Sequence, residues 1–455
     1  MGAALAATLV AAPVDPAAAG PLHLPPATRL MLRNGLTVWI VPTHRLPLVD
    51  LRLVVRAGAV DDPPGKEGLA HLTAELLTQG ATVRDARQLA EDIAFVGGSL
   101  EASTGVEQLV VSCEVLKKDL ATGLALFHDV IVAPSFAEPE FQRMKGQVLG
   151  NLVNAKNDPD SLADLELLPF LLGLSPLAHP PSGWGKSVAR INREDVVAFH
   201  GSHVRPDRAM LAVVGDIDPE AMRSMIEHAF ADWKPSGEKA REAYATVPQV
   251  HGRQLRIVSR PEVTQTQIRL ACLGVPRDHP DYYPILVANT ILGGAFMSRL
   301  VEEIRINQGL TYGIGSRFGM LRNAGTFTIR TFTRNETIRR TIDATLAEMK
   351  KLVDQGPTED ELAQAKRYLT GQFPLGLQAP DALAAQLLDV EFYRLDPHVL
   401  ETFPDRVGAV TMEDCRRALK SYFCVDDLRI LVVSDPAVAK PQLEGLGPVE
   451  VKEPQ

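Results

Sequence analysis

The feature that most restricts the fold of this 455-residue chain is a repeat within its own sequence. Residues 188–216 align without a gap with residues 407–435, 219 positions later, and each segment predicts a helix, a turn and a buried strand. A second pair of helical segments, beginning at Ala137 and Thr358, aligns at a nearly equal offset of 221. A period this long is too long for a solenoid and indicates two duplicated halves. The identical pairs include Glu194 and Glu413, Asp195 and Asp414, Asp207 and Asp426, Val213 and Val432, Val214 and Val433, and Asp216 and Asp435.

The repeat predicts how the chain is divided. We expect a leader or flexible arm over residues 1–26, a first half over 27–236, a polar linker over 237–248 and a second half over 249–455. The length is sufficient for several domains, each with its own core.

The order of patterns inside each half predicts the fold class. The runs LTVWIVP and LVDLRLVVRAG are typical of strands, and the turn signals beside them, Asn34-Gly35 and Gly58, favour a hairpin-like pair. The segment GKEGLAHLTAELLTQG predicts a helix, QLVVSCEV a strand, and a long helix begins near Asp119. Strands and helices are therefore mixed, and we predict an α+β fold of two homologous halves, each a largely antiparallel sheet covered by helices.

Charge and cysteine content exclude several classes of protein. Forty-seven Lys and Arg residues against 56 Asp and Glu residues give a net charge of −9, so the chain lacks the positive field that nucleic acids require. No apolar run beyond the leader reaches the roughly 18 residues of a membrane span. The four cysteines form no C-x-x-C pair, which argues against a metal ribbon or a disulfide framework, and we expect small buried hydrophobic side chains. The cysteines are Cys113, Cys272, Cys415 and Cys424.

The leader bears on the cellular compartment. Residues 2–12 are almost entirely Ala, Leu and Val, and Ala17-Ala18-Ala19 offers the small residues that a signal peptidase accepts. No Lys or Arg precedes Arg29, however, and the first segment of a signal peptide normally carries a positive charge. We expect a periplasmic or otherwise exported protein, with a cytoplasmic protein carrying an Ala/Pro-rich arm as the alternative.

Several segments carry a resemblance to a known family. The first half contains RAGAVDDPPGKEGLAHLTAELLTQGAT, DIAFVGGSLEAST and VAPSFAEPEFQRMKGQVLGNL, and the second half contains LGGAFMSRLVEEIRINQGLTYGIGS. Together they resemble the pitrilysin/insulinase-type zinc peptidases, the superfamily that includes mitochondrial processing peptidase. The resemblance covers nearly the whole chain after about Ala27. It implies that the two halves form one side of a clamshell, which closes on a second chain around a chamber for unfolded peptides.

The zinc motif of that superfamily is degenerate here. Active members carry H-x-x-E-H on a helix, where two His at i and i+4 bind zinc and the Glu polarises the attacking water. The resemblance places His71 at the first ligand, Ala74 at the catalytic Glu and Glu75 at the second His. Asn151 falls where a later helix supplies the third ligand. The sequence therefore predicts no zinc in this chain; His71 and Glu75 form either a hydrogen-bonded helix pair or, with a ligand from elsewhere, a metal site.

The second half keeps a different part of the machinery. Its pattern matches L-G-G-x-x-x-S-R-L followed by L-R-E-x-x-G-L-x-Y, and Arg305 and Tyr312 occupy the Arg and Tyr positions. Sequence alone predicts a helix that stops at Gly309, with Tyr312 at the start of a strand. The resemblance implies that this pair reaches the zinc site of an opposing chain and stabilises the developing oxyanion.

Three other patterns are interpreted as structural. The run SGWGKS is not a phosphate loop, because the first glycine of that motif would fall on Pro180. His200 and His203 match Leu419 and Tyr422 in the repeat, which favours packing over metal binding. Gly293-Gly294 is explained by a tight turn.

These observations lead to one main functional hypothesis and two alternatives. The chain is expected to be the non-zinc subunit of a heterodimeric metallopeptidase that acts on short unfolded peptides, inactive alone, with a sister subunit that holds zinc in an intact H-x-x-E-H. The first alternative is a catalytically inactive peptide-binding or assembly protein of the same fold. The second is a free-standing metalloenzyme that uses His71 and Glu75.

Overall fold

The computed structural model describes residues 24–235, 237, 247 and 249–454. The leader expected over residues 1–26 lies outside these residues except for its last three, and most of the linker expected over 237–248 also lies outside them. The boundaries of these two segments remain predictions.

The first half is built on a six-stranded sheet with the order β1-β2-β6-β3-β5-β4. All neighbouring strands are antiparallel except β2 and β6, which are parallel. The strands are β1 (Thr28–Met31), β2 (Thr37–Pro42), β3 (Leu48–Val55), β4 (Ser99–Thr104), β5 (Leu109–Leu116) and β6 (Ala209–Gly215).

The expected hairpin of the second and third strands is wrong. Strand β6 lies between β2 and β3 and pairs with both. Every residue of β6 is buried, as in a strand covered on both faces, so this most apolar strand takes the interior position.

The second half has a sheet with the order β12-β7-β11-β8-β10-β9, in which β7, β11, β8, β10 and β9 repeat the order of β2, β6, β3, β5 and β4. The sixth strand differs, because β1 precedes the other strands of its half whereas β12 follows them. Strand β7 is parallel to both β11 and β12, and the other neighbours are antiparallel. The predicted α+β class with two largely antiparallel sheets is confirmed. The strands are β7 (Gln254–Ser259), β8 (Gln265–Leu273), β9 (Ile314–Met320), β10 (Gly325–Arg334), β11 (Arg429–Ser434) and β12 (Val449–Lys452).

Helices of each half cover one face of its own sheet and enclose a separate apolar core. In the first half these are α1 (Leu69–Leu77), α2 (Ala86–Phe95), α3 (Leu120–Val132), α4 (Glu138–Asn157), α6 (Gly185–Val188), α7 (Arg193–His203) and α8 (Pro219–Ala229). In the second half they are α9 (Tyr282–Asn289), the π-helical turns η5 (Thr290–Gly294) and η6 (Val301–Asn307), α10 (Ile338–Gln355), α11 (Glu359–Gln372), α13 (Phe403–Ala409), α14 (Met412–Tyr422) and α15 (Pro436–Leu443).

The repeat read from the sequence extends to the helix caps. Asn192 caps α7 and forms a reciprocal pair with Asp195, and Thr411 caps α14 with Asp414 in the same way. These caps are 219 residues apart, as are the helices they begin. Because a capping box satisfies backbone N–H groups that the helix itself leaves unpaired, the two halves start these helices by the same local chemistry.

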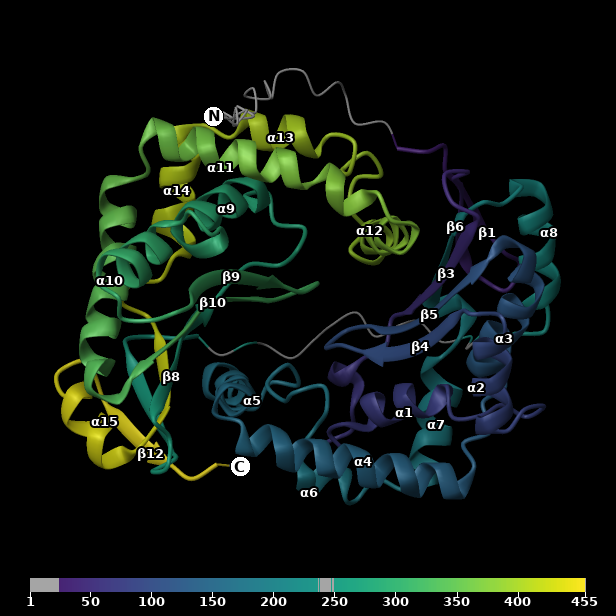
Figure 1. Ribbon diagram of the computed structural model, residues 1–455, viewed down its shortest axis with the longest axis horizontal. Coiled ribbons are helices and arrows are strands. Elements are labelled where there is room, and N and C mark those ends of the chain that lie inside the picture. Colours follow the sequence, from purple (N-terminus) through teal and green to yellow (C-terminus); the bar gives the residue numbers. More distant parts are fainter. Residues whose placement is uncertain (1–23, 236, 238–246, 248, 455) are drawn as a thin grey trace, which may run out of the picture.

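Two equivalent helices are exchanged between the halves (Figure 1). Helix α5 (Pro159–Leu172) belongs to the first half by sequence but packs on β7, β8 and β11 of the second sheet. Helix α12 (Pro380–Phe392) follows the second half's helices but packs on β3 and β6 of the first sheet. Each sheet therefore has its second face covered by a helix from the other half.

Apolar side chains account for most of the contact at both exchanged helices. Under α12, Leu383 and Leu387 meet Val54, Met210 and other residues of the first sheet. Under α5, a cluster of the same kind joins the two halves. Its buried members are Leu162, Ala163, Leu167, Phe170, Leu171, Leu172, Leu177, Ala178, Val250, Val258, Ala271, Leu431 and Val433.

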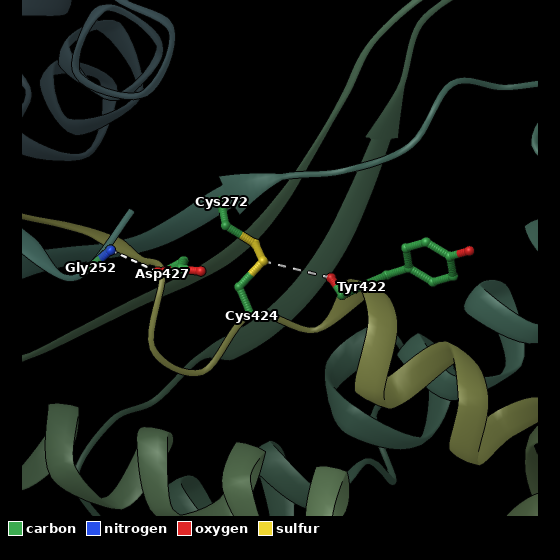
Figure 2. The surroundings of a disulfide bond; sticks show 5 residues. All are labelled: Gly252, Cys272, Tyr422, Cys424 and Asp427. Atoms are coloured by element: carbon green, nitrogen blue, oxygen red, sulfur yellow. Dashed lines mark hydrogen bonds between the residues drawn. A yellow bond between two sulfur atoms is a disulfide. The ribbon is translucent and has the colours of Figure 1, made fainter. Parts of the chain in front are cut away.

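A disulfide corrects the expectation that all four cysteines are small buried hydrophobic side chains. Cys272 at the end of β8 is bonded to Cys424, in the loop between α14 and β11 (Figure 2). The two are 152 residues apart in sequence, and their Cα atoms are 6.4 Å apart. Cys113 and Cys415 are buried free thiols, as expected, and burial raises the pKa of each to about 12. The bonded pair shares no short spacing motif, so the pairing could not be predicted from the positions of the cysteines.

Within the described residues, no helix is both long enough and apolar enough to cross a membrane.

Candidate functional site

The first candidate region is helix α1, whose start is fixed by backbone contacts. The carboxylate of Asp62 accepts hydrogen bonds from the N–H groups of Gly68 and Ala70, both at 2.7 Å. Gly183 lies against the turn that precedes α1, so close that a Cβ on this residue would be 1.9 Å from the carbonyl oxygen of Glu67. The SGWGKS run is thus a packing segment against the beginning of α1, which agrees with its structural interpretation.

The degenerate motif residues lie on α1 and α4. His71 and Glu75 are both half-buried one turn apart, and the structure shows no hydrogen bond between them. Burial lowers the pKa of His71, and the negative charge of Glu75 partly opposes this shift. Ala74 is completely buried in the core of the first half, and Asn151 is exposed on α4, which packs beside α1.

This arrangement does not fit a zinc ion. Among the described residues, no three or more His, Cys, Asp or Glu side chains are placed to hold a metal. The position of the general base carries the methyl group of Ala74, which accepts no proton, and Asn151 offers only a neutral amide. Helix α1 keeps the shape of the motif without its chemistry.

The second candidate region is formed by η6 and the segment before β9. Gly309, with φ of +60°, allows the chain to turn after η6, and the turn returns Tyr312 to the side of Arg305. The guanidinium carbon of Arg305 lies 4.8 Å from the ring centre of Tyr312 and 5.1 Å from that of Phe296. The structure therefore brings together the two residues that the sequence singled out, and a third ring that it did not.

Exposed apolar side chains surround this pair. Tyr312 is 77% exposed and Phe296 is 64% exposed, and Met297 and Ile306 are also exposed. The guanidinium of Arg305 packs against two aromatic rings, so it can contact a ligand while losing little conformational freedom on binding. We call Phe296, Met297, Arg305, Ile306 and Tyr312 the Arg305 surface. The sequence analysis did not single out Phe296 and Met297; the two adjacent large apolar residues in the run AFMSR are the signal that could have identified them.

The remaining structural interpretations agree with the geometry. His200 lies 2.8 Å from the carbonyl oxygen of Ile131 through its Nε2, and His203 receives a hydrogen bond from Arg208 at Nδ1. Burial lowers the pKa of both histidines. A Cβ on Gly293 would lie 2.6 Å from the Ser316 hydroxyl, so close packing explains that glycine.

Sequence reasoning missed a cavity of about 780 Å³ between α5 and the second sheet, lined by both charged and apolar residues. Its walls come from α5, from β8, β9 and β10, and from the glycine pair of η5. The lining residues are Asp160, Asp164, Leu167, Leu168, Gln265, Gln267, Arg269, Gly293, Gly294, Gly313, Ile314, Gly315, Ser316, Arg317, Thr328, Arg330, Thr331 and Phe332. The sequence had no signal for it, because the exchange of α5 creates it.

Comparison with protein families gives two matches in chain order. Residues 38–170 match the family described as Insulinase (Peptidase family M16), and residues 190–369 match the Peptidase M16 inactive domain. The matches fall on the first half and across the boundary into the second.

Relatives and solved structures agree with these matches. An uncharacterized zinc protease of Mycobacterium tuberculosis is 29% identical over 411 residues, covering 88% of this chain and 91% of the relative. An uncharacterized zinc protease of Rickettsia bellii is 27% identical over 342 residues, covering 74% of this chain and 81% of the relative. The crystal structure of a peptidase M16 inactive domain from Pseudomonas fluorescens superposes with a TM-score of 0.83 at 29% identity, over 90% of this chain and 98% of that one. A protease structure from Helicobacter pylori, at 20% identity and a TM-score of 0.85, shows the same fold over 90% of this chain and all of that one.

Proposed function

Since the chain belongs to the pitrilysin/insulinase-type zinc peptidase superfamily, we propose that it is the non-zinc subunit of a two-subunit peptidase. In this proposal a sister chain carries the intact H-x-x-E-H and the zinc, and the substrates are short unfolded peptides. This chain cleaves nothing by itself, because Ala74 and Asn151 remove the base and one ligand.

One observation carries the proposal: Arg305 and Tyr312 lie side by side on an exposed surface. An exposed tyrosine that stabilised only the fold would be expected to bury its ring, yet 77% of Tyr312 is accessible. The same chain has filled the motif position on α1 with a buried methyl group. The pattern is that of a chain that contributes one part of a composite site and leaves the other part to its partner.

The chemistry assigned to this chain is the stabilisation of charge. As a peptide carbonyl is attacked, negative charge develops on its oxygen, and the phenol of Tyr312 and the guanidinium of Arg305 donate hydrogen bonds to that oxygen. Phe296 and Tyr312 flank the guanidinium, which restricts its motion before the substrate arrives. Activation of the attacking water belongs to the partner.

The disulfide supports export as part of the proposal. Stable disulfides form in oxidising compartments and are rare in reducing cytosol, so the Cys272–Cys424 bond favours the periplasm or the cell exterior. Fractionation of the producing cell with trapping of free thiols would find the protein outside the cytoplasm with two free cysteines rather than four. A cytoplasmic protein with four free thiols would contradict export.

Peptide turnover by the complex of the two chains tests the function. Tyr312→Phe removes one hydroxyl and little packing, and loss of one oxyanion donor lowers kcat by about 10²- to 10³-fold. Arg305→Lys keeps the charge but loses the planar fork and should also slow turnover. Tyr282→Phe is the matched control, because Tyr282 is a partly exposed tyrosine on α9 that stacks on a different arginine, Arg277, and is not part of the Arg305 surface.

Complex formation and melting temperature are measured beside turnover. The proposal requires that both Arg305 and Tyr312 variants assemble and melt as the parent does while turnover falls. Turnover within a factor of about two of the parent in both variants would contradict the proposal and favour the binding or assembly protein.

A further inference from the structure

One face of the second sheet is only partly covered. Along β10, buried residues alternate with residues that point away from the core, and the latter are Thr326, Thr328, Arg330, Phe332 and Arg334. Helix α5 covers this face over β7, β8 and β11. Toward β10 and the edge strand β9, the same face lines the 780 Å³ cavity.

The acidic groups of the cavity are already paired. Arg269, whose side chain is only 1% exposed, donates to Asp160 at 2.7 Å and to Asp164 at 2.6 Å. Arg330 from β10 pairs with the same two carboxylates. Two positive and two negative charges thus offset one another, and this group has no net charge to offer a ligand.

Arg317 is the remaining charge on the cavity wall. It lies on β9, opposite Thr328 of β10, and it is exposed. Among the described residues, no hydrogen bond or ion pair reaches its guanidinium, so the cavity carries a net positive charge at this end. An unpaired guanidinium favours a carboxylate or another planar anion.

The other end of the cavity offers an acceptor. Gln267 of β8 lies opposite Phe332 of β10, and its Oε1 is buried with no hydrogen-bond partner among the described residues. A buried acceptor without a donor is unfavourable, and a ligand N–H would relieve the cost. A simple inorganic anion supplies no such donor, whereas a peptide has a backbone N–H beside every carbonyl.

The register of the strands fixes the distance between these two groups. The partners of Arg317 and Gln267 on β10, Thr328 and Phe332, are four residues apart. With about 3.3 Å per residue along a strand and about 4.8 Å between strands, the backbones of Arg317 and Gln267 are roughly 16 Å apart. That is the length of about five extended residues. Gly313, just before β9, and Gly315 of β9 line the cavity without side chains and leave room for a chain.

We propose that this cavity binds an extended peptide segment of about five residues that ends in, or contains, a carboxylate, with Arg317 pairing with the carboxylate and Gln267 accepting a backbone N–H. The inference rests on the proposed function in that it takes peptides to be what reaches this face. It adds a preference for anionic peptides, set on the non-zinc chain and away from Arg305 and Tyr312.

Direct binding to the isolated full chain tests the inference without turnover or a partner. The probes are fluorescent eight-residue peptides in three forms: a free C-terminal carboxylate with Gln inside, an amidated C-terminus with Glu inside, and an amidated C-terminus with Gln inside. The third form should bind at least about 10-fold more weakly than whichever of the first two binds best, because it lacks a charge-assisted bond. The first two forms distinguish a terminal from a side-chain carboxylate.

Variants locate the binding. Arg317→Ala should weaken the preferred peptide by about 10-fold or more and leave the neutral peptide almost unaffected. Gln267→Leu should weaken all the peptides several-fold, since the N–H acceptor is lost. Arg334→Ala is the matched control, an exposed arginine on the same face of β10 that does not line the cavity, and should change affinity by less than about twofold.

Three results would overturn the inference. The first two are a parent chain that binds all three peptides with equal affinity and a parent chain that binds none of them. The third result is an Arg317→Ala chain that binds the preferred charged peptide as tightly as the parent does. None of these results changes the expected effect of Tyr312→Phe on turnover. Conversely, normal turnover in that variant would remove the proposed function and leave the measured peptide affinities as they are.

Discussion

The two halves of this protein share the order of five strands and the same cap on α7 and α14, and each receives one helix from the other, but they differ in what lies under that helix. Beneath α12, the first sheet buries Asp50, whose Oδ1 has no hydrogen-bond partner and whose nearest cation, Arg52, is 3.9 Å away. Beneath α5, the second sheet buries Arg269, which has two carboxylates within 2.7 Å. The duplicated backbone therefore constrains the fold and not the charges between its layers.

The two halves also differ in the helices that follow their third and eighth strands, β3 and β8. The helix after β3 is α1, which packs Ala74 into the core, whereas α9 after β8 is followed by the π-helical turns η5 and η6, and η6 carries Arg305 and Ile306 of the Arg305 surface. Irregular helical turns are frequent at functional sites, because they present side chains that a regular helix would direct elsewhere. In the first half the motif position is therefore buried in the core, whereas in the second half Tyr312 and its neighbours remain exposed.

The largest effect is expected from removing the buried cation of the second half. Arg269→Ala leaves a cavity where a large, fully buried side chain stood and removes its hydrogen bonds to Asp160 and Asp164, so it should destabilise the protein by about 3–5 kcal/mol. Arg330→Ala, which removes the 55%-exposed cation of the same network, should cost less than about 1 kcal/mol. Urea unfolding of both variants measures the contrast. Equal losses would show that burial does not distinguish the two arginines.

In the first half, removing a buried charged group should stabilise the protein instead of destabilising it, and only at higher pH. Burial raises the pKa of Asp50 to about 7, with Arg52 opposing the shift and Asp381 and Glu114 adding to it. An unfolded Asp loses its proton near pH 4, whereas the native state keeps it until about pH 7, so stability falls as pH rises across this interval.

Asp50→Asn removes that dependence. The variant should be more stable than the parent by roughly 2–4 kcal/mol at pH 8 and should approach it near pH 4. Unfolding midpoints at the two pH values provide the measurement. A variant that is less stable at pH 8 would mean that the ionised carboxylate is stabilised by contacts beyond those described.

The smallest effect on activity is expected from rebuilding the zinc motif. Ala74→Glu with Glu75→His restores H-x-x-E-H on α1 but leaves Asn151 in place of a ligand, so the isolated chain should still hydrolyse no peptide. Metal analysis and a peptide assay on that double variant measure this outcome. Hydrolysis by the double variant alone would show that the two halves do not divide the work as proposed.

Local chemistry in the sequence predicted much of the fold. The offset of 219 residues placed α7 and α14 in equivalent positions, and the structure shows the same cap at each, Asn192 in one half and Thr411 in the other. The resemblance to the family motif also identified Arg305 and Tyr312; the structure places the guanidinium carbon of Arg305 4.8 Å from the ring centre of Tyr312. Patterns confined to a short segment, or repeated at a constant offset, can be recognised in one sequence.

Long-range pairing could not be predicted from such patterns. The apolar stripe of a helix indicates that one face of the helix is buried, but it does not indicate which sheet covers that face. The exchange of α5 and α12 therefore cannot be recognised in a single sequence. The insertion of β6 between β2 and β3, the Cys272–Cys424 bond and the cavity beside Arg317 all depend on contacts between distant segments. Each was missed for the same physical reason.

The reciprocal position of α5 and α12 also bears on how a duplicated chain of this kind arose. A single half, standing alone, would leave one face of its sheet and the apolar side of its departing helix in contact with water. Two identical copies could cover both at once by lending each other that helix, as domain-swapped dimers do. Fusion of two such copies keeps this reciprocal packing within one chain, where the two halves can carry different residues at equivalent positions.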